Sequence, residues 1–382
     1  MAGIYLHVPF CKKACHYCNF HFSTSTGLKN DFVQALLKEI TLRSNYLQDE
    51  TVATIYFGGG TPSLLDKDEL RAILHALQQH FVIAPDAEVT LEANPDDITA
   101  ANLANWKEAG INRLSIGIQS FFEDDLQWMN RAHTAEQSVN SIQLAQAAGF
   151  NNLTIDLIYG GPTLSDQKWK ENVATAIALN IPHLSCYALT VEPGTALQKM
   201  IGLHKKEPVD NDRQAHHFLL LMEWLQVAGY EHYEISNFAK PGSRSRHNTA
   251  YWQGKKYLGL GPSAHSYNGS ARQWNIANNA LYIQSLTQGT VPFEIELLTP
   301  TQRLNEYIMT SLRTIEGLDL TSVATSFGES AKASVTASVQ PWIKKGLCIL
   351  NDQHIILTTE GKLFADGVAA DLFLEEAPAS QN

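Results

Sequence analysis

The first half of the chain alternates between two patterns of apolar residues. Short runs in which most residues are apolar predict buried strands, and the stretches between them, with apolar residues at every third or fourth position, predict helices. The predicted strands are residues 5–8, 52–57, 88–92, 113–117, 153–158 and 183–189. The helices predicted between them are residues 31–47, 66–80, 99–109, 136–148 and 167–179. This regular alternation specifies a parallel sheet whose strands are joined by crossover helices.

Two architectures fit the strand–helix repeats: an incomplete barrel of the TIM type and an open, doubly wound sheet. The polar residues favour the barrel, because they fall at or just after the carboxyl ends of successive strands, where barrel active sites are built. They are the cysteines between 11 and 18, Gly58 to Gly60, Glu92, Gln119 and Asp156. We therefore expect an α/β fold with a partial (β/α)6 TIM-like barrel.

The second half of the chain has a different pattern. Residues 212–229 form an amphipathic helix, and a loop rich in turn-forming residues follows at 240–246. From residue 301 the pattern is three helices and then two short apolar runs around Asn351-Asp352, which predicts a β-hairpin. This order indicates a C-terminal winged-helix-like domain. With the boundary between Ala277 and Pro292, the barrel domain takes residues 1–280 and the winged-helix-like domain takes residues 290–382.

Composition narrows the class of protein. With 382 residues, 44% of them hydrophobic, the chain can bury a large core. Its net charge of −11 offers little attraction to phosphate backbones, so we expect a docking or lid module in the C-terminal domain and no nucleic-acid partner, although solubility alone would also explain the acidity. No apolar run is long enough to span a bilayer, and no basic leader with a small-residue cleavage site is present, so we expect no stable membrane insertion and a cytoplasmic location.

Three of the five cysteines form a cluster, Cys11, Cys15 and Cys18, on the loop after the first predicted strand. Three thiolates on one loop suit three irons of a [4Fe–4S] cluster, which leaves the fourth iron open to a chelating small molecule such as S-adenosylmethionine. The alternative is a structural zinc site completed by His16 or His21. The spacing favours the cluster, because the other two cysteines are single and remote in the sequence.

The cysteine loop resembles that of the radical S-adenosylmethionine superfamily. Further matches at Gly58-Gly59-Gly60-Thr61-Pro62, Glu92, Gln119, Arg131 and Asp156 place the resemblance in the branch of the oxygen-independent coproporphyrinogen III oxidases. It covers nearly the whole chain and implies the partial barrel, the [4Fe–4S] cluster and S-adenosylmethionine. The cofactor contacts that it implies are Tyr5, Tyr17, Phe20, Gly59, Gly60, Thr61, Glu92, Gln119, Arg131, Asp156 and Ala188.

The glycines and the two acids in this group also have structural explanations that involve no cofactor. The glycines of 58–60 could form only a tight strand-to-helix turn, or they could expose backbone amides to a bound carboxylate. Glu92 and Asp156 interrupt apolar strands, and a buried carboxylate needs a partner. That partner is a salt bridge to Arg113 or Arg131, or, as the resemblance implies, the ammonium and ribose of S-adenosylmethionine.

Within the branch, the chain is most similar to the HemW-type heme chaperones. Phe20 stands where the oxidases have a fourth cysteine, and His247-Asn248-Thr-Ala-Tyr251-Trp252 matches the H-N-x-x-Y-W signature of the chaperones. Only four residues precede Tyr5, so we expect the N-terminal arm of the oxidases to be absent. The resemblance implies a chaperone that binds heme and passes it to an acceptor protein, which the sequence does not identify. The alternatives are an oxygen-independent coproporphyrinogen III oxidase and another radical enzyme.

The expected heme ligand is His247. Its segment combines an imidazole with the aromatic rings of Tyr251 and Trp252, and Arg244 and Arg246 just upstream suit the heme propionates. We expect an exposed site with a single axial ligand, because a chaperone must release its heme. The alternative is an aromatic-rich packing segment, and His265 and Cys186 are weaker candidates for the ligand.

Overall fold

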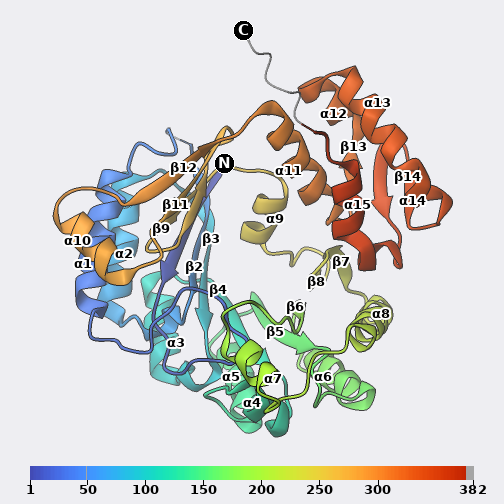
Figure 1. The fold of residues 1–382 in the computed structure, drawn as a ribbon. Helices are drawn as coiled ribbons and strands as arrows, with labels where there is room; N and C mark the ends of the chain where they lie inside the picture. Colours follow the sequence, from blue (N-terminus) through green and yellow to red (C-terminus); the bar gives the residue numbers. More distant parts are fainter. Residues whose placement is uncertain (49, 376–382) are drawn as a thin grey trace.

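A large, mostly parallel sheet organises the structure, a computed structural model that describes residues 1–48 and 50–375 (Figure 1). Its first six strands pair in sequence order, each parallel to the next. They are β1 (Ala2–Val8), β2 (Val52–Gly59), β3 (Ile83–Ala93), β4 (Arg113–Gln119), β5 (Leu153–Tyr159) and β6 (His183–Ala188). A doubly wound sheet would reverse its strand order part-way, and this sheet does not. The partial (β/α)6 barrel is thus confirmed.

Helices on the outer face cover these strands, as the apolar periodicity predicted. They are α1 (Lys29–Leu42), α2 (Lys67–His80), α3 (Ala100–Ala109), α5 (Ala135–Ala147) and α6 (Asp166–Ala178). Helix α2 shows why they form: Asp66 and Glu69 make a capping box at its start, and the residues that it buries recur every three or four positions. The short helices α4 (Glu123–Met129) and α7 (Ala196–Gly202), on the loops after β4 and β6, were not predicted.

The sheet continues beyond the barrel strands at both edges. Next to β6 lie β8 (Asn237–Ala239) and β7 (Glu231–Glu234), which follow helix α8 (Asn211–Val227). On the other side, β9 (Tyr257–Leu260) pairs parallel to β1 and is followed outwards by β10 (His265–Tyr267), β11 (Ala271–Asn275) and β12 (Phe293–Leu297). Helix α9 (Arg246–Trp252) connects the two edges, and α10 (Asn279–Thr287) packs against α1.

The position of β12 corrects the predicted boundary. The whole strand is hydrogen-bonded to β11, and Tyr282 and Leu286 of α10 belong to the core of the barrel domain. The change from one core to the next therefore comes after Leu297, and the boundary expected between Ala277 and Pro292 is too early. The prediction missed α10 within that stretch and the edge strand after it, although Phe293, Ile295 and Leu297 alternate with glutamates in the sequence.

The C-terminal part has its own hydrophobic core, built from residues between Leu304 and Leu372. Its elements are α11 (Pro300–Leu312), β13 (Leu318–Asp319), α12 (Leu320–Phe327), α13 (Glu329–Ser338), α14 (Gln340–Lys344), β14 (Cys348–Asn351), β15 (His354–Leu357) and α15 (Ala365–Leu372). Four helices precede the β14–β15 hairpin, one more than the three predicted, and the short strand β13 follows the first of them. Backbone hydrogen bonds between Ile235 and Arg313 and between Ile315 and Tyr233 join this part to β7 of the barrel sheet.

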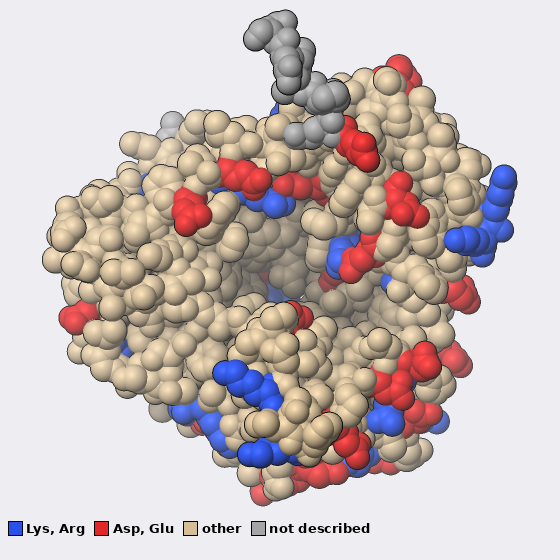
Figure 2. All heavy atoms as spheres, viewed as in Figure 1, with Lys and Arg blue, Asp and Glu red and all other residues tan. Residues whose placement is uncertain are grey.

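Figure 2 shows acidic and basic side chains side by side around a central hollow on one face of the molecule. In the described residues, no helix combines the length and the apolar character needed to cross a bilayer.

Candidate cluster and cofactor site

The cysteine loop leaves β1 and folds back on itself. Ser23 closes it, because its N–H donates to Pro9 O (2.9 Å) and its carbonyl accepts from Cys11 N–H (3.0 Å). Asn130, just after α4, donates from Nδ2 to Ala14 O (2.7 Å) and so holds the middle of the loop. The three cysteines of the loop are half-buried and free of disulfides.

The thiols of the loop suit a positively charged metal centre. Burial raises the pKa of Cys11, and it raises the pKa of Cys18 to about 11, with neighbouring thiolates adding to both effects. Arg131 Nη1 donates to Cys15 Sγ (3.3 Å) and supplies one compensating positive charge. Iron would supply the rest, since thiolates are the usual ligands of iron–sulfur clusters.

A zinc site finds less support in the loop. His16 Nδ1 contacts Trp128 O (3.1 Å), and His21 Nε2 contacts Asn279 Oδ1 (2.7 Å). Among residues 1–48 and 50–375, no three His, Cys, Asp or Glu side chains gather around one ion position. The two histidines considered as the fourth zinc ligand, His16 and His21, thus both have polar partners outside the cysteine loop.

Gly60, directly after β2, is required by close packing against the start of the cysteine loop. A Cβ at Gly60 would lie 2.6 Å from Phe10 O and 2.8 Å from Val8 O. The backbone N–H of Gly60 donates to Val8 O (2.9 Å), and that of Thr61 donates to Phe10 O (2.7 Å). Of the two alternatives for this turn, the tight-packing one holds for the amides of these two residues, which fasten the start of the cysteine loop.

Glu92 and Asp156 are close enough to repel each other, and Arg131 and Arg113 lie near Asp156 without forming an ion pair with it. Glu92 accepts a hydrogen bond from Tyr56 Oη (2.7 Å), and in the described chain neither acid has a salt bridge. Arg113 instead approaches Glu88 (3.8 Å). Burial, together with the nearby charge of Asp156, raises the pKa of Glu92 to about 8. Burial likewise raises the pKa of Asp156 to about 6.

These two carboxylates fit a cationic ligand. The alternative of a salt bridge to Arg113 or Arg131 fails for both acids. Arg131 is engaged elsewhere, since its Nη2 donates to Asn94 Oδ1 and to Gly117 O, both at 2.7 Å. A positive group stabilises the ionised form of an acid that burial keeps partly protonated, because its charge offsets the cost of burying the carboxylate. The ammonium and sulfonium of S-adenosylmethionine have that charge.

The other expected contacts lie around the same end of the barrel. Gln119 is buried at the end of β4 and has a left-handed backbone (φ 64°), a strained conformation that is frequent at binding sites. Tyr17 lies beside Arg131 and is one of the groups that raise the pKa of Arg131. Ala188 ends β6 and is partly buried. Phe20 is 65% exposed on the cysteine loop.

His247 does not lie on an exposed segment, contrary to our expectation. It is only 3% exposed, its Nδ1 hydrogen-bonds with Thr54 Oγ1 (2.8 Å), and its Nε2 lies 3.3 Å from Tyr251 Oη. Burial lowers its pKa to about 3, so the ring is neutral. With both nitrogens occupied inside the barrel, His247 presents no lone pair to heme at the surface.

The arginines upstream of His247 also have other partners. Arg244 pairs with Glu231 (3.1 Å) and Glu316 (2.7 Å), and Arg246 donates to Asp86 O (2.6 Å). Sequence reasoning missed Tyr56 and Thr54, the two side chains between His247 and Glu92. Thr54 and Tyr56 are two positions apart on β2, and alternate residues of a strand share one face. This spacing could have indicated that both side chains point to the same side of the sheet.

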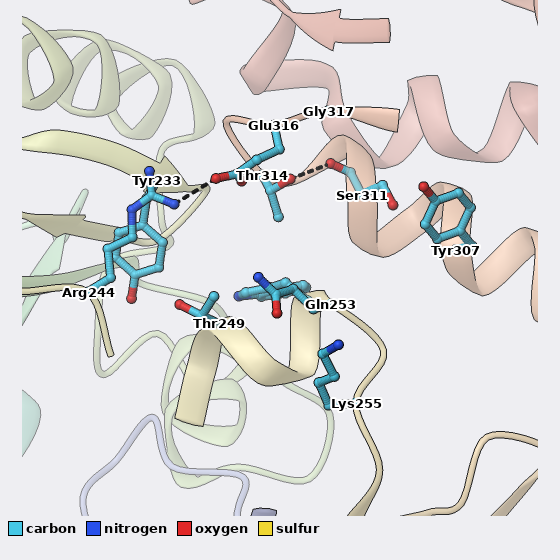
Figure 3. A pocket seen from close by; sticks show the side chains of 11 residues that line it. Tyr233, Arg244, Thr249, Gln253, Lys255, Tyr307, Ser311, Thr314, Glu316 and Gly317 are labelled. Carbon is cyan, nitrogen blue, oxygen red and sulfur yellow. Dashed lines mark hydrogen bonds and ion pairs between the residues drawn. The ribbon is translucent and has the colours of Figure 1, made fainter. Parts of the chain in front are cut away.

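A pocket of about 280 Å³ lies on the other side of α9, between the barrel and the C-terminal part. Figure 3 shows Thr249 of α9 and Gln253, the residue after this helix, facing Ser311 and Thr314 across the pocket, with the Arg244–Glu316 ion pair at one end. Helix α9 thus has one face in the barrel and one face in the pocket.

Comparisons with known proteins agree with this architecture. Residues 5–176 match the sequence model of the radical SAM superfamily, and residues 298–364 match that of the HemN C-terminal domain. The heme chaperone HemW of Mycobacterium tuberculosis (strain ATCC 25618 / H37Rv) is 36% identical over 97% of this chain and 94% of its own length. The heme chaperone HemW of Bacillus subtilis (strain 168) is 31% identical over 96% of this chain and 98% of its own length.

Among solved structures, coproporphyrinogen III oxidase (HemN) from Escherichia coli, a radical SAM enzyme, superimposes with a TM-score of 0.85. The match covers 97% of this chain and 90% of the oxidase, at 24% sequence identity. At this identity the likeness establishes the shared fold.

Proposed function

This chain belongs to the HemW family of the radical SAM superfamily, and we propose that it is a heme chaperone, which binds heme and transfers it to an acceptor protein. It carries a [4Fe–4S] cluster and S-adenosylmethionine. The observation that best supports the function is the identity of 36% to a heme chaperone along 97% of the chain. The cofactor site has independent support from two carboxylates that form no salt bridge among the described residues, Glu92 and Asp156, and from the three-cysteine loop.

In this proposal, Cys11, Cys15 and Cys18 hold the cluster, Glu92 binds the ammonium of S-adenosylmethionine, and Asp156 binds its ribose. Arg131 stabilises the cysteine loop through Cys15. The remaining proposed contacts are Tyr5, Tyr17, Phe20, Gly59, Gly60, Thr61, Gln119 and Ala188. When bound, the cluster and S-adenosylmethionine together supply one-electron chemistry, which heme transfer itself does not require.

We also propose a cytoplasmic location, where thiols stay reduced, and a protein rather than a nucleic acid as the partner of the C-terminal part. The mixture of acidic and basic side chains in Figure 2 and the net charge of −11 support the second statement.

The proposal is tested by offering heme and coproporphyrinogen separately to anaerobically reconstituted protein. We expect saturable heme binding with a Soret band and no protoporphyrinogen formation, since Phe20 replaces the fourth cysteine of the oxidases. Absorption spectroscopy follows the heme, and chromatography follows the porphyrinogens.

The Cys11→Ala variant is the control for the cluster and should lose the broad iron–sulfur absorbance, whereas Cys348→Ala, remote in the C-terminal core, should keep it. Protoporphyrinogen formed at catalytic turnover would overturn the chaperone assignment in favour of the oxidase.

A further inference from the structure

Helix α9 is fixed against the barrel at its first turn. Glu88 on β3 accepts hydrogen bonds from the backbone N–H of Arg246 (3.2 Å) and of His247 (3.1 Å). Ser245 is fully buried and caps the helix by accepting from Asn248 N–H (3.2 Å). The start of α9 therefore has a defined position relative to β3.

This position places the His247 ring in a stack of aromatic side chains on the barrel strands. The ring lies on Tyr56, with centroids 5.0 Å apart and an angle of 24° between the planes. Tyr5 continues the stack beside Tyr56 (6.1 Å, 24°), and Tyr251 meets His247 edge-on (4.9 Å, 88°). Such contacts between aromatic rings fix orientation as well as burying area.

The stack ends at the carboxylate proposed to bind S-adenosylmethionine. Tyr56 Oη donates to Glu92 Oε1 (2.7 Å). The surroundings leave little freedom, because a Cβ at Gly58 would lie 2.9 Å from the rings of both Tyr5 and Tyr56 and 3.1 Å from Glu92 Oε1. A displaced Tyr56 ring would therefore move the Glu92 carboxylate with it.

We infer that His247 is a positioning residue for S-adenosylmethionine: it holds Tyr56 so that the Tyr56 hydroxyl orients Glu92 toward the ammonium of the cofactor. This inference rests on the cofactor site of the proposed function. It gives the H-N-x-x-Y-W histidine a task inside the barrel, and His247 acts on the cofactor only through Tyr56 and Glu92.

The test measures S-adenosylmethionine affinity by equilibrium dialysis with reconstituted protein. We expect His247→Ala to raise the dissociation constant about tenfold, the size of effect typical of coupled neighbours. The His247→Phe variant keeps a ring on Tyr56 and should restore affinity to within about twofold of the native value. Iron content and thermal unfolding of each variant show whether the cluster and the fold are intact.

A double-mutant cycle with Tyr56→Phe tests whether His247 acts on Glu92 through Tyr56. If His247 acts through the Tyr56 hydroxyl, the double variant His247→Ala/Tyr56→Phe should bind S-adenosylmethionine no more weakly than Tyr56→Phe alone. Trp252→Ala is the matched control, because Trp252 is on the same helix but lines the pocket on its other side, and it should leave the affinity unchanged.

The inference is overturned if His247→Ala binds S-adenosylmethionine as the native protein does, or if the effects of the two substitutions simply add. Loss of heme binding by His247→Phe with unchanged S-adenosylmethionine affinity would also overturn it and would make His247 the heme ligand. Failure of the proposed function has a different signature: the native protein itself would bind no heme or assemble no cluster.

Discussion

At the scale of single residues, the site contains two acids, Glu92 and Asp156, that form no salt bridge among the described residues. Glu92 has only a tyrosine hydroxyl and a backbone amide as partners, and the neighbouring Asp156 adds repulsion. Burying a carboxylate in this way costs stability unless it stays protonated. The ligand-free site is therefore strained electrostatically, and a bound cation relieves the strain.

This strain predicts an unusual pH dependence of stability. Between the ordinary pKa of 4.5 and the folded-state value of about 8, the unfolded chain has lost the Glu92 proton and the folded protein keeps it. The free energy of unfolding of the ligand-free protein should thus fall as pH rises through this window, by at most about 1.4 kcal/mol per pH unit from this group. Urea denaturation from pH 5 to pH 8 measures it.

Glu92→Gln should flatten this part of the profile, whereas Glu171→Gln, on the exposed face of α6, should leave it unchanged. A profile of Glu92→Gln with the native slope would show that another group is responsible. Asp156 contributes with the same sign only up to about pH 6, where its folded-state pKa lies.

The rule that parallel strands present their carboxyl ends together placed the cysteines, Glu92, Gln119 and Asp156 at one end of the sheet, and the resemblance to the radical SAM superfamily selected them as site residues. Sequence reasoning missed the Tyr56 partner of Glu92, since that contact depends on which inward-facing side chains meet across strands. It was also wrong about the exposure of His247. A seven-residue helix can turn a given side chain to either side, and here the anchor that decides, Glu88, lies about 160 residues away in sequence.

At the scale of elements, the junction between β1 and β2 determines the shape of the cysteine loop. The amides of Gly60 and Thr61 bind the carbonyls of Val8 and Phe10, and no side chain fits between the two backbones. The loop therefore starts from a rigid base, although the cysteines themselves are in irregular structure.

We expect Gly60→Ala to disturb this base, because its Cβ would lie 2.6 Å from Phe10 O. The substitution should destabilise the protein by roughly 1–3 kcal/mol, as overpacking of a tight site usually does. It should also lower the iron bound after anaerobic reconstitution. Metal analysis and urea denaturation measure the two effects.

Gly202→Ala at the end of α7 is the control, since a Cβ there meets no atom within 4 Å. Native iron content in Gly60→Ala would mean that the loop adapts and that the junction does not set its shape.

The long, periodic elements were the ones predicted correctly. Each βα unit of the barrel has a strand buried on both faces and an amphipathic helix, so the apolar pattern is strong. The strands β7 to β12 are short, and β12 exposes alternate apolar residues (Phe293, Ile295 and Leu297). They form because a neighbouring strand offers hydrogen bonds, which is tertiary information that a local pattern does not contain.

At the scale of the whole molecule, a half-buried lysine lies where the C-terminal part meets the barrel sheet. Lys362 Nζ reaches His232 Nδ1 on β7 (2.8 Å), and the His232 ring stacks on Phe238 of β8 (4.1 Å). Burial lowers the pKa of Lys362 to about 8 and that of His232 to about 3. The folded state therefore favours the neutral form of both side chains, because burial penalises their charged forms.

Alkaline pH should remove the cost of burying the charge of Lys362. Between pH 8 and the ordinary lysine pKa of 10.5, the unfolded chain keeps the Lys362 proton and the folded protein has lost it. The contribution of Lys362 to the free energy of unfolding should thus rise across this window. It is measured as the difference between the native protein and Lys362→Met in urea at pH 8, 9 and 10.

Lys344→Met, at the exposed end of α14, should give no such difference. A difference for Lys362→Met that stays constant with pH would contradict the lowered pKa.

The pairing of β1 has a consequence for the newly made chain. This strand lies between β2 and β9, and Gly3 pairs with Tyr257. A ribosome that adds 5–20 residues per second needs on the order of ten to fifty seconds to make the intervening chain. During that interval β2 to β6 can assemble in order as they emerge, while one edge of β1 keeps its backbone groups unpaired. Unpaired edges recruit foreign strands, so the nascent protein is most exposed to misassembly at the very strand that leads into its cysteine loop.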